Sequence, residues 1–481
     1  MKKFFSNNNM VDSQSVNPLL PLDEYIPDVE ARVFKNREGE ERLYLYGSHD
    51  NFGSKTWCSY RYYVYSSPTS DLKNWSCHGV SFASRKSEGY VWKNKNADGI
   101  KWNNERLYAP DVNKIGNKYY LITCSAEGGC LGVAIAENPE GPFSPAQKIV
   151  FDDGEETSSI DPALYVEETN GQIKVYLFWG QRPSFNGKGL LGAELQKDKN
   201  GIYRILKKET LKVLFTGEND EFGFYEGASI RKIMDKYYIL YPSDKGRGVH
   251  VMSYAVSDSP LGKYEYRGNI LENDGCDLRS GNNHGSFCKV NGQWYLFYHR
   301  GSNNSDTQRR VCVEKIYFNE NGNISGENGG EVPMTNHGFG KSLCPYQKIE
   351  AAYATHVRIA GFKNGCYLTE KNKQLHPLIN ITDGNCVEYR DFDFNTGGLL
   401  EFSATILPKN GGKIEIVVDS PNAEAAGTLH IPKKIFGRYS EFKTNIKSLS
   451  GTHTVYLRFK GNKNKKICEL AHFKFKKLKN K

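Results

Sequence analysis

The sequence predicts an all-β protein in which a five-bladed β-propeller precedes a β-sandwich of the jelly-roll type. Two observations support this fold class. Aromatic residues that favour strands are abundant, with 30 Tyr and 25 Phe among 481 residues, beside 47 Gly that suit tight turns. A Tyr- and Leu-rich strand also recurs along the chain at a spacing close to one four-stranded blade with its loops.

The recurring strands lie in the first two thirds of the chain. They read "RLYLYGSHD", "KYYLITCSA", "KVYLFWGQ", "KYYILYPSD" and "QWYLFYHR". An offset second strand with a turn of Ser, Pro or Gly accompanies several of them, as in "YYVYSSPTSDLKNW" and "MSYAVSDSPLGKY". Repetition of the same two-part unit favours a propeller over a sandwich for this region. We assign residues 1–20 to an N-terminal tail and residues 21–340 to the propeller.

One ionisable residue stands just before each Tyr-rich strand. The segments "YIPDVEARVF", "LYAPDVNKI", "SSIDPALYV", "FYEGASIRK" and "GNNHGSFCKV" place there Asp28, Asp111, Asp161, Glu226 and His284. The innermost strands of a propeller line a central axis, so these residues are expected to converge on one cavity. Each residue taken alone is equally explained as a turn, cap or core residue. Their shared position favours a site.

Such a cluster predicts acid–base chemistry. Burial and mutual repulsion raise the pKa of carboxyl groups, so at least one should stay protonated near neutral pH while a better hydrated one ionises. A protonated carboxyl and an ionised carboxylate are the two groups that glycoside hydrolysis uses, about 6.5–9.5 Å apart when the reaction inverts the anomeric centre.

The region from about Pro21 to Gly340 resembles glycoside hydrolase family 43, a family of five-bladed propellers acting on arabinose and xylose glycosides. The motifs are "LYAPDV", "SIDPA", "FYEGASIRKIMDKYYILY" and "GNNHGSF" with "WYLFYHR". The resemblance implies that Asp28 is the general base, Glu226 the general acid, and Asp161 the residue that orients this acid and raises its pKa. His284 is similar to a histidine that helps many members to hold a channel metal ion, often calcium. No cofactor is implied for the chemistry itself.

The resemblance implies an inverting, exo-acting enzyme that releases α-L-arabinofuranosyl groups, with β-xylosidase or dual activity as the alternative. We assign substrate binding to Asp111, His49, Trp57 and Arg300, although Trp57 is equally explained by packing. The insertions "SRKSEGYVWKNKNADGIKW" and "RPSFNGKG" would wall off a pocket. A non-catalytic glycan-binding propeller is the competing function.

Residues 345–478 form short strands separated by Gly and Asn turns, typical of a β-sandwich. The pieces "IEAAYAT", "DGNCVEY", "GTHTVYLRFKG" and "ELAHFKF" resemble carbohydrate-binding module family 6. Ala352 and Ala471 stand where that family has carboxylates, which argues against a tight calcium site. Two interpretations remain open: a working carbohydrate module, or a sandwich that braces the propeller.

The remaining features exclude other classes. The net charge is +9, with many of the lysines near the C-terminus, and no basic stripe indicates nucleic-acid binding. Eleven Cys without a CxxC pattern suggest reduced, buried thiols. We expect no membrane association and, from the lack of a secretory h-region at the N-terminus, a cytoplasmic location. No GxSxG, HExxH or P-loop motif occurs.

Overall fold

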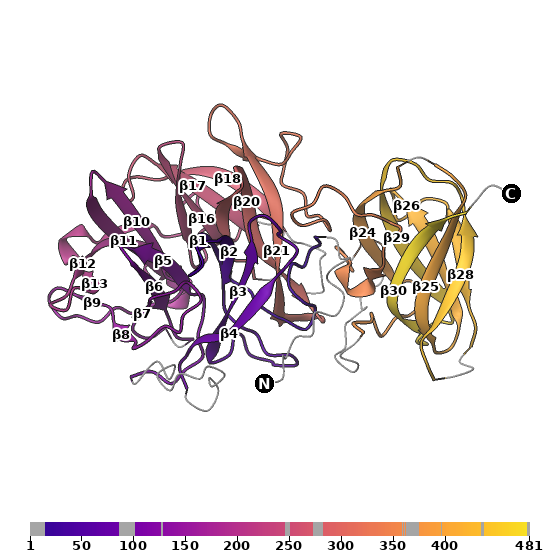
Figure 1. The fold of residues 1–481 in the computed structure, drawn as a ribbon, viewed down its shortest axis with the longest axis horizontal. Helices are drawn as coiled ribbons and strands as arrows, with labels where there is room; N and C mark the ends of the chain where they lie inside the picture. The colour runs from indigo at the N-terminus through magenta and orange to yellow at the C-terminus, as the bar shows by residue number, and fades with distance from the viewer. Residues whose placement is uncertain are drawn as a thin grey trace.

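The computed structural model describes residues 15–85, 102–126, 128–245, 251–272, 282–357, 359, 361, 375–395, 397–433 and 437–478. These residues build an all-β fold with two bodies, the larger formed by the N-terminal part of the chain and the smaller by the C-terminal part (Figure 1). The all-β class and the propeller followed by a sandwich are confirmed. Within the described part of the chain, no helix is long and apolar enough to cross a membrane.

The larger body consists of sheets that follow one another along the chain, antiparallel throughout except where β9 pairs parallel with β13 in the third sheet. The strands of the first two sheets are β1 (Glu30–Lys35), β2 (Glu41–Tyr46), β3 (Arg61–Pro68), β4 (Ser76–Ala83), β5 (Asp111–Ile115), β6 (Lys118–Thr123), β7 (Gly132–Ala136) and β8 (Gln147–Lys148). The third sheet holds β9 (Val150–Phe151), β10 (Ala163–Thr169), β11 (Gln172–Gln181), β12 (Gly189–Lys197), β13 (Tyr203–Leu206) and β14 (Lys212–Phe215).

The remaining sheets of this body have the same plan. They comprise β15 (Ser229–Ile233), β16 (Lys236–Ser243), β17 (Val251–Ser257) and β18 (Glu265–Glu272), then β19 (Ser286–Val290), β20 (Gln293–Ser302), β21 (Ser305–Phe318) and β22 (Ile324–Ser325). Two short 3-10 turns, η1 (Pro183–Phe185) and η2 (Lys208–Thr210), lie in the connections.

The first strands of these sheets contact one another in a closed ring, in the order β1, β5, β10, β15, β19 and back to β1. The apolar core follows the same cycle, because a cluster of buried side chains lies between each sheet and the next, including the last and the first. Burying aliphatic and aromatic side chains on both faces of each sheet is what stacks the sheets. The ring brings the N-terminal ends of the first strands together.

The smaller body is a sandwich of two antiparallel sheets around one core. One sheet holds β23 (Ile349–Glu350), β30 (Cys468–Lys477), β25 (Leu400–Pro408) and β28 (Ser440–Ile446), and the other holds β24 (Cys386–Asp393), β29 (Thr452–Gly461), β26 (Gly412–Val418) and β27 (Gly427–Ile431). The 3-10 turn η3 (Ala351–Tyr353) follows β23.

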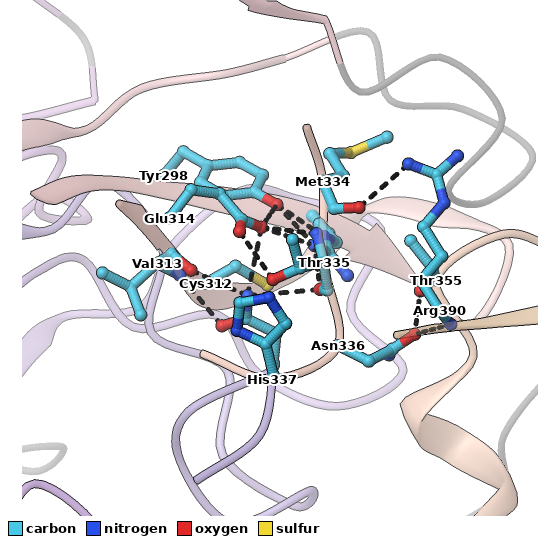
Figure 2. Close-up of polar contacts among 12 residues, drawn as sticks. Tyr298, Cys312, Val313, Glu314, Met334, Thr335, Asn336, His337, Thr355 and Arg390 are labelled. Carbon is cyan, nitrogen blue, oxygen red and sulfur yellow. Dashed lines mark hydrogen bonds and ion pairs between the residues drawn. The ribbon is translucent and has the colours of Figure 1, made fainter. Parts of the chain in front are cut away.

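A buried polar junction joins the two bodies, and Figure 2 shows its contacts. Asn336 accepts hydrogen bonds from Thr355 and from the backbone N–H of Arg390, the latter at 2.8 Å, and donates to the carbonyl of Tyr353. The Arg390 side chain donates to the carbonyl of Met334 at 2.9 Å. The sandwich is therefore attached through specific bonds as well as through the chain.

Residues 15–20 pack against the last propeller sheet. They are the described part of the segment that was assigned to an N-terminal tail. The side chain of Asn17 donates to the carbonyl of Val313 at 2.8 Å, and the backbone N–H of Leu19 donates to the carbonyl of Val311 at 3.0 Å. Leu19 and Leu20 belong to the core cluster between the last and first sheets. Residues 15–20 thus form part of the propeller's closure.

Candidate active site

Each inner strand has an equivalent position two residues before its first residue, and three of the residues at this position share one backbone conformation. They are Asp28 before β1, Asp161 before β10 and Gly227 before β15. All three have a left-handed backbone, with φ of 57°, 55° and 64°. This conformation is uncommon for residues other than glycine and suggests that the surrounding structure holds the two aspartates in strained positions.

Asp28 is buried and lies against the guanidinium group of Arg309. Nη1 of Arg309 donates to Oδ1 of Asp28 at 2.9 Å. Burial by itself would raise the pKa of Asp28, but the positive charge of the nearby Arg309 is the largest opposing effect and holds the pKa below its ordinary value. Asp28 is therefore ionised across the neutral range, as a general base requires.

Arg309 is fixed by Asp50. Nε of Arg309 donates to Oδ2 of Asp50 at 2.9 Å and Nη2 donates to Oδ1 at 3.0 Å, so the pair is bidentate. Sequence reasoning missed Arg309, Asp50 and Ser48. The available signal was the segment "GSHD" after a Tyr-rich strand, in which Ser48 and Asp50 face this cluster, whereas His49 contacts Ser59 and Tyr63 instead.

Glu226 is the second carboxyl group of the cluster. Nδ2 of Asn282 donates to its Oε1 at 3.1 Å, and Gln181 also hydrogen-bonds its carboxyl group. Burial and the negative charge of Asp28 raise the pKa of Glu226 to about 7, although both hydrogen bonds and Arg309 act in the opposite direction. A substantial fraction of Glu226 is therefore protonated near neutral pH, as a general acid requires.

Asp161 is the third buried carboxyl group. Burial first, and then the charges of Glu226 and Asp28, raise the pKa of Asp161 well above its ordinary value. Its backbone N–H donates to Sγ of Cys124 at 3.2 Å, which contributes to holding the left-handed conformation. Asp161 and Glu226 repel each other when both are ionised, so this pair retains a proton around neutral pH.

Asp111 lies deeper in the ring than the sequence pattern indicates. It pairs with Ile122 as the first residue of β5, and the equivalent residue of β1 is Glu30, which pairs with Tyr46. Asp111 therefore occupies the layer of Glu30, two positions beyond Asp28. The motif "PDV" precedes β1 at residues 27–29, whereas at residues 110–112 its Asp and Val already belong to β5.

This deeper layer is an ion-pair network along the axis. Nη2 of Arg32 lies 2.9 Å from both carboxylate oxygens of Asp111, and Nη2 of Arg231 donates to Oε2 of Glu30 at 2.7 Å. The residues Arg32 and Arg231 come from facing inner strands. Two guanidinium groups and two carboxylates thus fill the axis beneath the cluster.

His284 lies beside Asp161, with Nδ1 of the histidine 4.0 Å from Oδ2 of the aspartate. Burial lowers the pKa of His284, so its ring is neutral near pH 7. Gly227 leaves room for this ring, because a Cβ atom there would lie 2.8 Å from Cε1 of His284. The histidine thus takes the space that a side chain at position 227 would occupy.

The residues around His284 do not fit a tight calcium site. Calcium takes about six to eight oxygen ligands, whereas Oδ1 of Asp28 is engaged by Arg309 and Asp161 is 4.0 Å from the histidine. Among the described residues, no group of three or more His, Cys, Asp or Glu could hold a metal ion.

The other residues assigned to substrate binding lie at different distances from the cluster. Trp57 is 42% exposed, and its neighbour Cys58 contacts Arg309, so it lies on a loop next to the site. Arg300 is buried, where it donates to Tyr298, Glu314 and the carbonyl of Thr335. The structure does not bring Arg300 into contact with the carboxylate cluster. Of the two insertions, residues 182–189 are described, whereas residues 86–101 of the insertion 84–102 lie outside the described residues.

The arrangement joins an ionised carboxylate, Asp28, to a carboxyl group that is protonated near neutral pH, Glu226. A model of glycosyl hydrolases family 43 matches residues 32–324, which is more than half of the chain. The chain belongs to glycosyl hydrolase family 43. A model of the carbohydrate binding module of family 6 matches residues 362–477.

Relatives of this family 43 chain carry related names. A "Xylosidase/arabinosidase" from Thermoclostridium stercorarium is 29% identical over 93% of this chain and 97% of its own length. An "Arabinoxylan arabinofuranohydrolase" from Bacillus subtilis is 26% identical over 90% of this chain and 88% of its own length. The crystal structure of a family 43 arabinoxylan arabinofuranohydrolase from Bacillus subtilis, in complex with cellotetraose, matches with a TM-score of 0.50 and 23% identity over 96% of this chain and 97% of its own, which supports the fold.

Proposed function

We propose that this family 43 glycosidase is an inverting, exo-acting enzyme that releases α-L-arabinofuranosyl groups from arabinoxylan- or arabinan-derived oligosaccharides. The observation that carries the mechanism is the opposite displacement of two pKa values in one cluster, with Asp28 below its ordinary value and Glu226 at about 7. The names of the two relatives over nearly the whole chain support arabinose as the released sugar.

In the proposed reaction, Glu226 gives its proton to the glycosidic oxygen as the bond from this oxygen to the anomeric carbon breaks. A water molecule attacks the anomeric carbon from the opposite face, and Asp28 takes the proton that the water loses. Arg309 keeps Asp28 ionised for this role. Asp161 and Glu226 repel each other when both are ionised, which opposes loss of the last proton from this pair before the reaction.

A β-D-xylosidase is the second candidate, because the same relative is named for both activities. Purified protein should be given 4-nitrophenyl α-L-arabinofuranoside and 4-nitrophenyl β-D-xylopyranoside in parallel. We expect kcat/KM to be higher on the arabinofuranoside. A higher value on the xyloside would assign the enzyme to the second candidate.

The variants Asp28→Asn and Glu226→Gln keep the shape of each side chain and remove its proton chemistry. Each should lower kcat/KM on an oligosaccharide by at least about 100-fold while the unfolding temperature stays near that of wild type. Release of sugar at the wild-type rate by either variant would remove that residue from its role. Binding of arabino-oligosaccharides without any turnover by wild type would favour a glycan-binding propeller instead.

A further inference from the structure

Asn282 lies between the proposed acid and the arginine that holds the proposed base. Its Oδ1 accepts a hydrogen bond from Nη1 of Arg309 at 2.8 Å, and its Nδ2 donates to Oε1 of Glu226 at 3.1 Å. The same Nη1 atom of Arg309 donates to Oδ1 of Asp28 at 2.9 Å. One side chain thus connects the two halves of the catalytic pair.

The orientation of this amide follows from its neighbours. A guanidinium group has only donors, so the atom of Asn282 that faces Arg309 must be the carbonyl oxygen. The NH₂ group then faces Glu226. Asp50 holds the Nε and Nη2 atoms of Arg309. The arginine therefore cannot move aside to allow the opposite orientation of the Asn282 amide.

The backbone of Asn282 is tied to the base as well. Burial lowers the pKa of His299 to about 3, so its ring is neutral. The ring nitrogen Nδ1 accepts the backbone N–H of Asp28 at 3.3 Å, which leaves Nε2 as the donor to the carbonyl oxygen of Asn282 at 3.1 Å. Both the backbone and the side chain of Asn282 are therefore held in place relative to Asp28.

We propose that Asn282 is a positioning residue that holds the carboxyl group of Glu226 for protonation of the leaving group and keeps it in register with Asp28. The inference rests on the proposed glycosidase function. Because the amide donates to Oε1, it disfavours the acidic proton on that oxygen and fixes the orientation of the carboxyl group. Asn282 itself neither gives nor takes a proton.

The hydrogen bond from Asn282 shifts the pKa of Glu226 in a definite direction. Donation by the amide stabilises the ionised form of Glu226 and thereby lowers its pKa, against burial and the charge of Asp28, which raise it. Removing the amide should therefore move the alkaline limb of the pH profile upward. The charged and titratable groups facing Glu226 in this balance are Asp28, Asp161, Arg309, Tyr108 and Tyr225.

The test compares two aryl α-L-arabinofuranosides, one with a dinitrophenyl leaving group that departs without protonation and one with a phenyl group that needs the acid. If wild type prefers xylosides, the matching xylosides are used. In Asn282→Ala, kcat/KM on the phenyl glycoside should fall at least about 10-fold more than on the dinitrophenyl glycoside. Asn282→Asp keeps the acceptor for Arg309 but places a carboxylate beside Glu226, so it should lose more on the phenyl glycoside and shift the alkaline limb further upward.

Asn113→Ala is the matched control, because Asn113 also lies on the inner ring and its amide donates to the carbonyl of Leu164, not to Glu226. This variant should keep the wild-type ratio between the two glycosides. Equal losses on both glycosides in folded Asn282→Ala and Asn282→Asp would overturn the inference and indicate a purely structural role. An inactive wild type would instead refute the proposed function.

Discussion

Asp28 and Glu226 are carboxyl groups of one buried cluster, yet their environments differ in one decisive respect. Asp28 shares a hydrogen bond with the guanidinium of Arg309, whereas the hydrogen bonds that the described residues donate to Glu226 come from the neutral amides of Asn282 and Gln181. A cation stabilises an ionised carboxylate more than an amide does, so the first proton to leave belongs to Asp28. Asp28 ionised beside protonated Glu226 is the state in which the pair is ready to act.

The pH profile of kcat/KM should therefore be bell-shaped. Activity needs ionised Asp28 and protonated Glu226, so it should be lost as the pH falls through the depressed pKa of Asp28 and as the pH rises through the pKa of Glu226 at about 7. Initial rates at low substrate concentration between pH 3 and 10 measure both limbs. An alkaline limb that is absent up to pH 10 would contradict the assignment of Glu226 as the acid.

At the scale of an element, the backbone just before β15 explains the position of the proposed acid, Glu226. Gly227 occupies the place that Asp28 and Asp161 occupy before their strands, and all three share a left-handed backbone. Since Gly227 has no side chain, His284 fills the space and the carboxyl group comes from the preceding residue, Glu226. The acid is thus displaced by one residue relative to the two aspartates.

Gly227→Ala should damage this site directly. Its Cβ would lie 2.8 Å from Cε1 of His284 and 3.3 Å from Cβ of Asp161, at a φ of 64° that costs a non-glycine residue about 1 kcal/mol or more. We expect at least about a 10-fold loss of kcat with only a modest fall in unfolding temperature. Gly201→Ala, at a φ of 80° and with no atom within 4 Å of its Cβ, controls for the backbone cost alone. Equal activity of the two variants would contradict the packing argument.

The sequence predicted the strands better than it predicted which residues of different strands lie at the same level. The Tyr-rich repeat marks the second strand of each sheet, because a strand that is buried on both faces leaves a continuous run of apolar and aromatic residues in one segment. It placed Asp28, Asp161, Glu226 and His284 at the right ends of the inner strands. Asp111 was aligned with Asp28, but the strand pairing aligns it with Glu30.

The partners of these carboxyl groups could not be predicted from local pattern. Arg309 lies 281 positions from Asp28 along the chain and Asn282 lies 56 positions from Glu226. No periodicity links residues so far apart, and an arginine in "QRRVCV" reads like any charged residue near a strand. Only the closed ring of sheets brings them together.

At the scale of the whole molecule, the buried junction favours the interpretation of the sandwich as a brace. Asn336 is fully buried and bonds the segment after the propeller to Tyr353, Thr355 and Arg390 on the sandwich side.

Asn336→Ala should destabilise the protein, because it leaves buried groups on both sides of the junction unpaired at about 1–3 kcal/mol each. Calorimetry should show a lower unfolding temperature or a split into two transitions, whereas the exposed Asn321→Ala should match wild type. An unchanged single transition in Asn336→Ala would show that the junction does not couple the two bodies.

The stereochemistry of the released sugar tests the central claim most directly. Proton NMR of the anomeric signal, recorded in the first minutes after enzyme is added to an α-L-arabinofuranoside, distinguishes the first-formed anomer from the later equilibrium mixture. Direct attack by water activated by Asp28, with Glu226 as the acid, predicts the β anomer first. First appearance of the α anomer would mean that configuration is retained and would contradict this account.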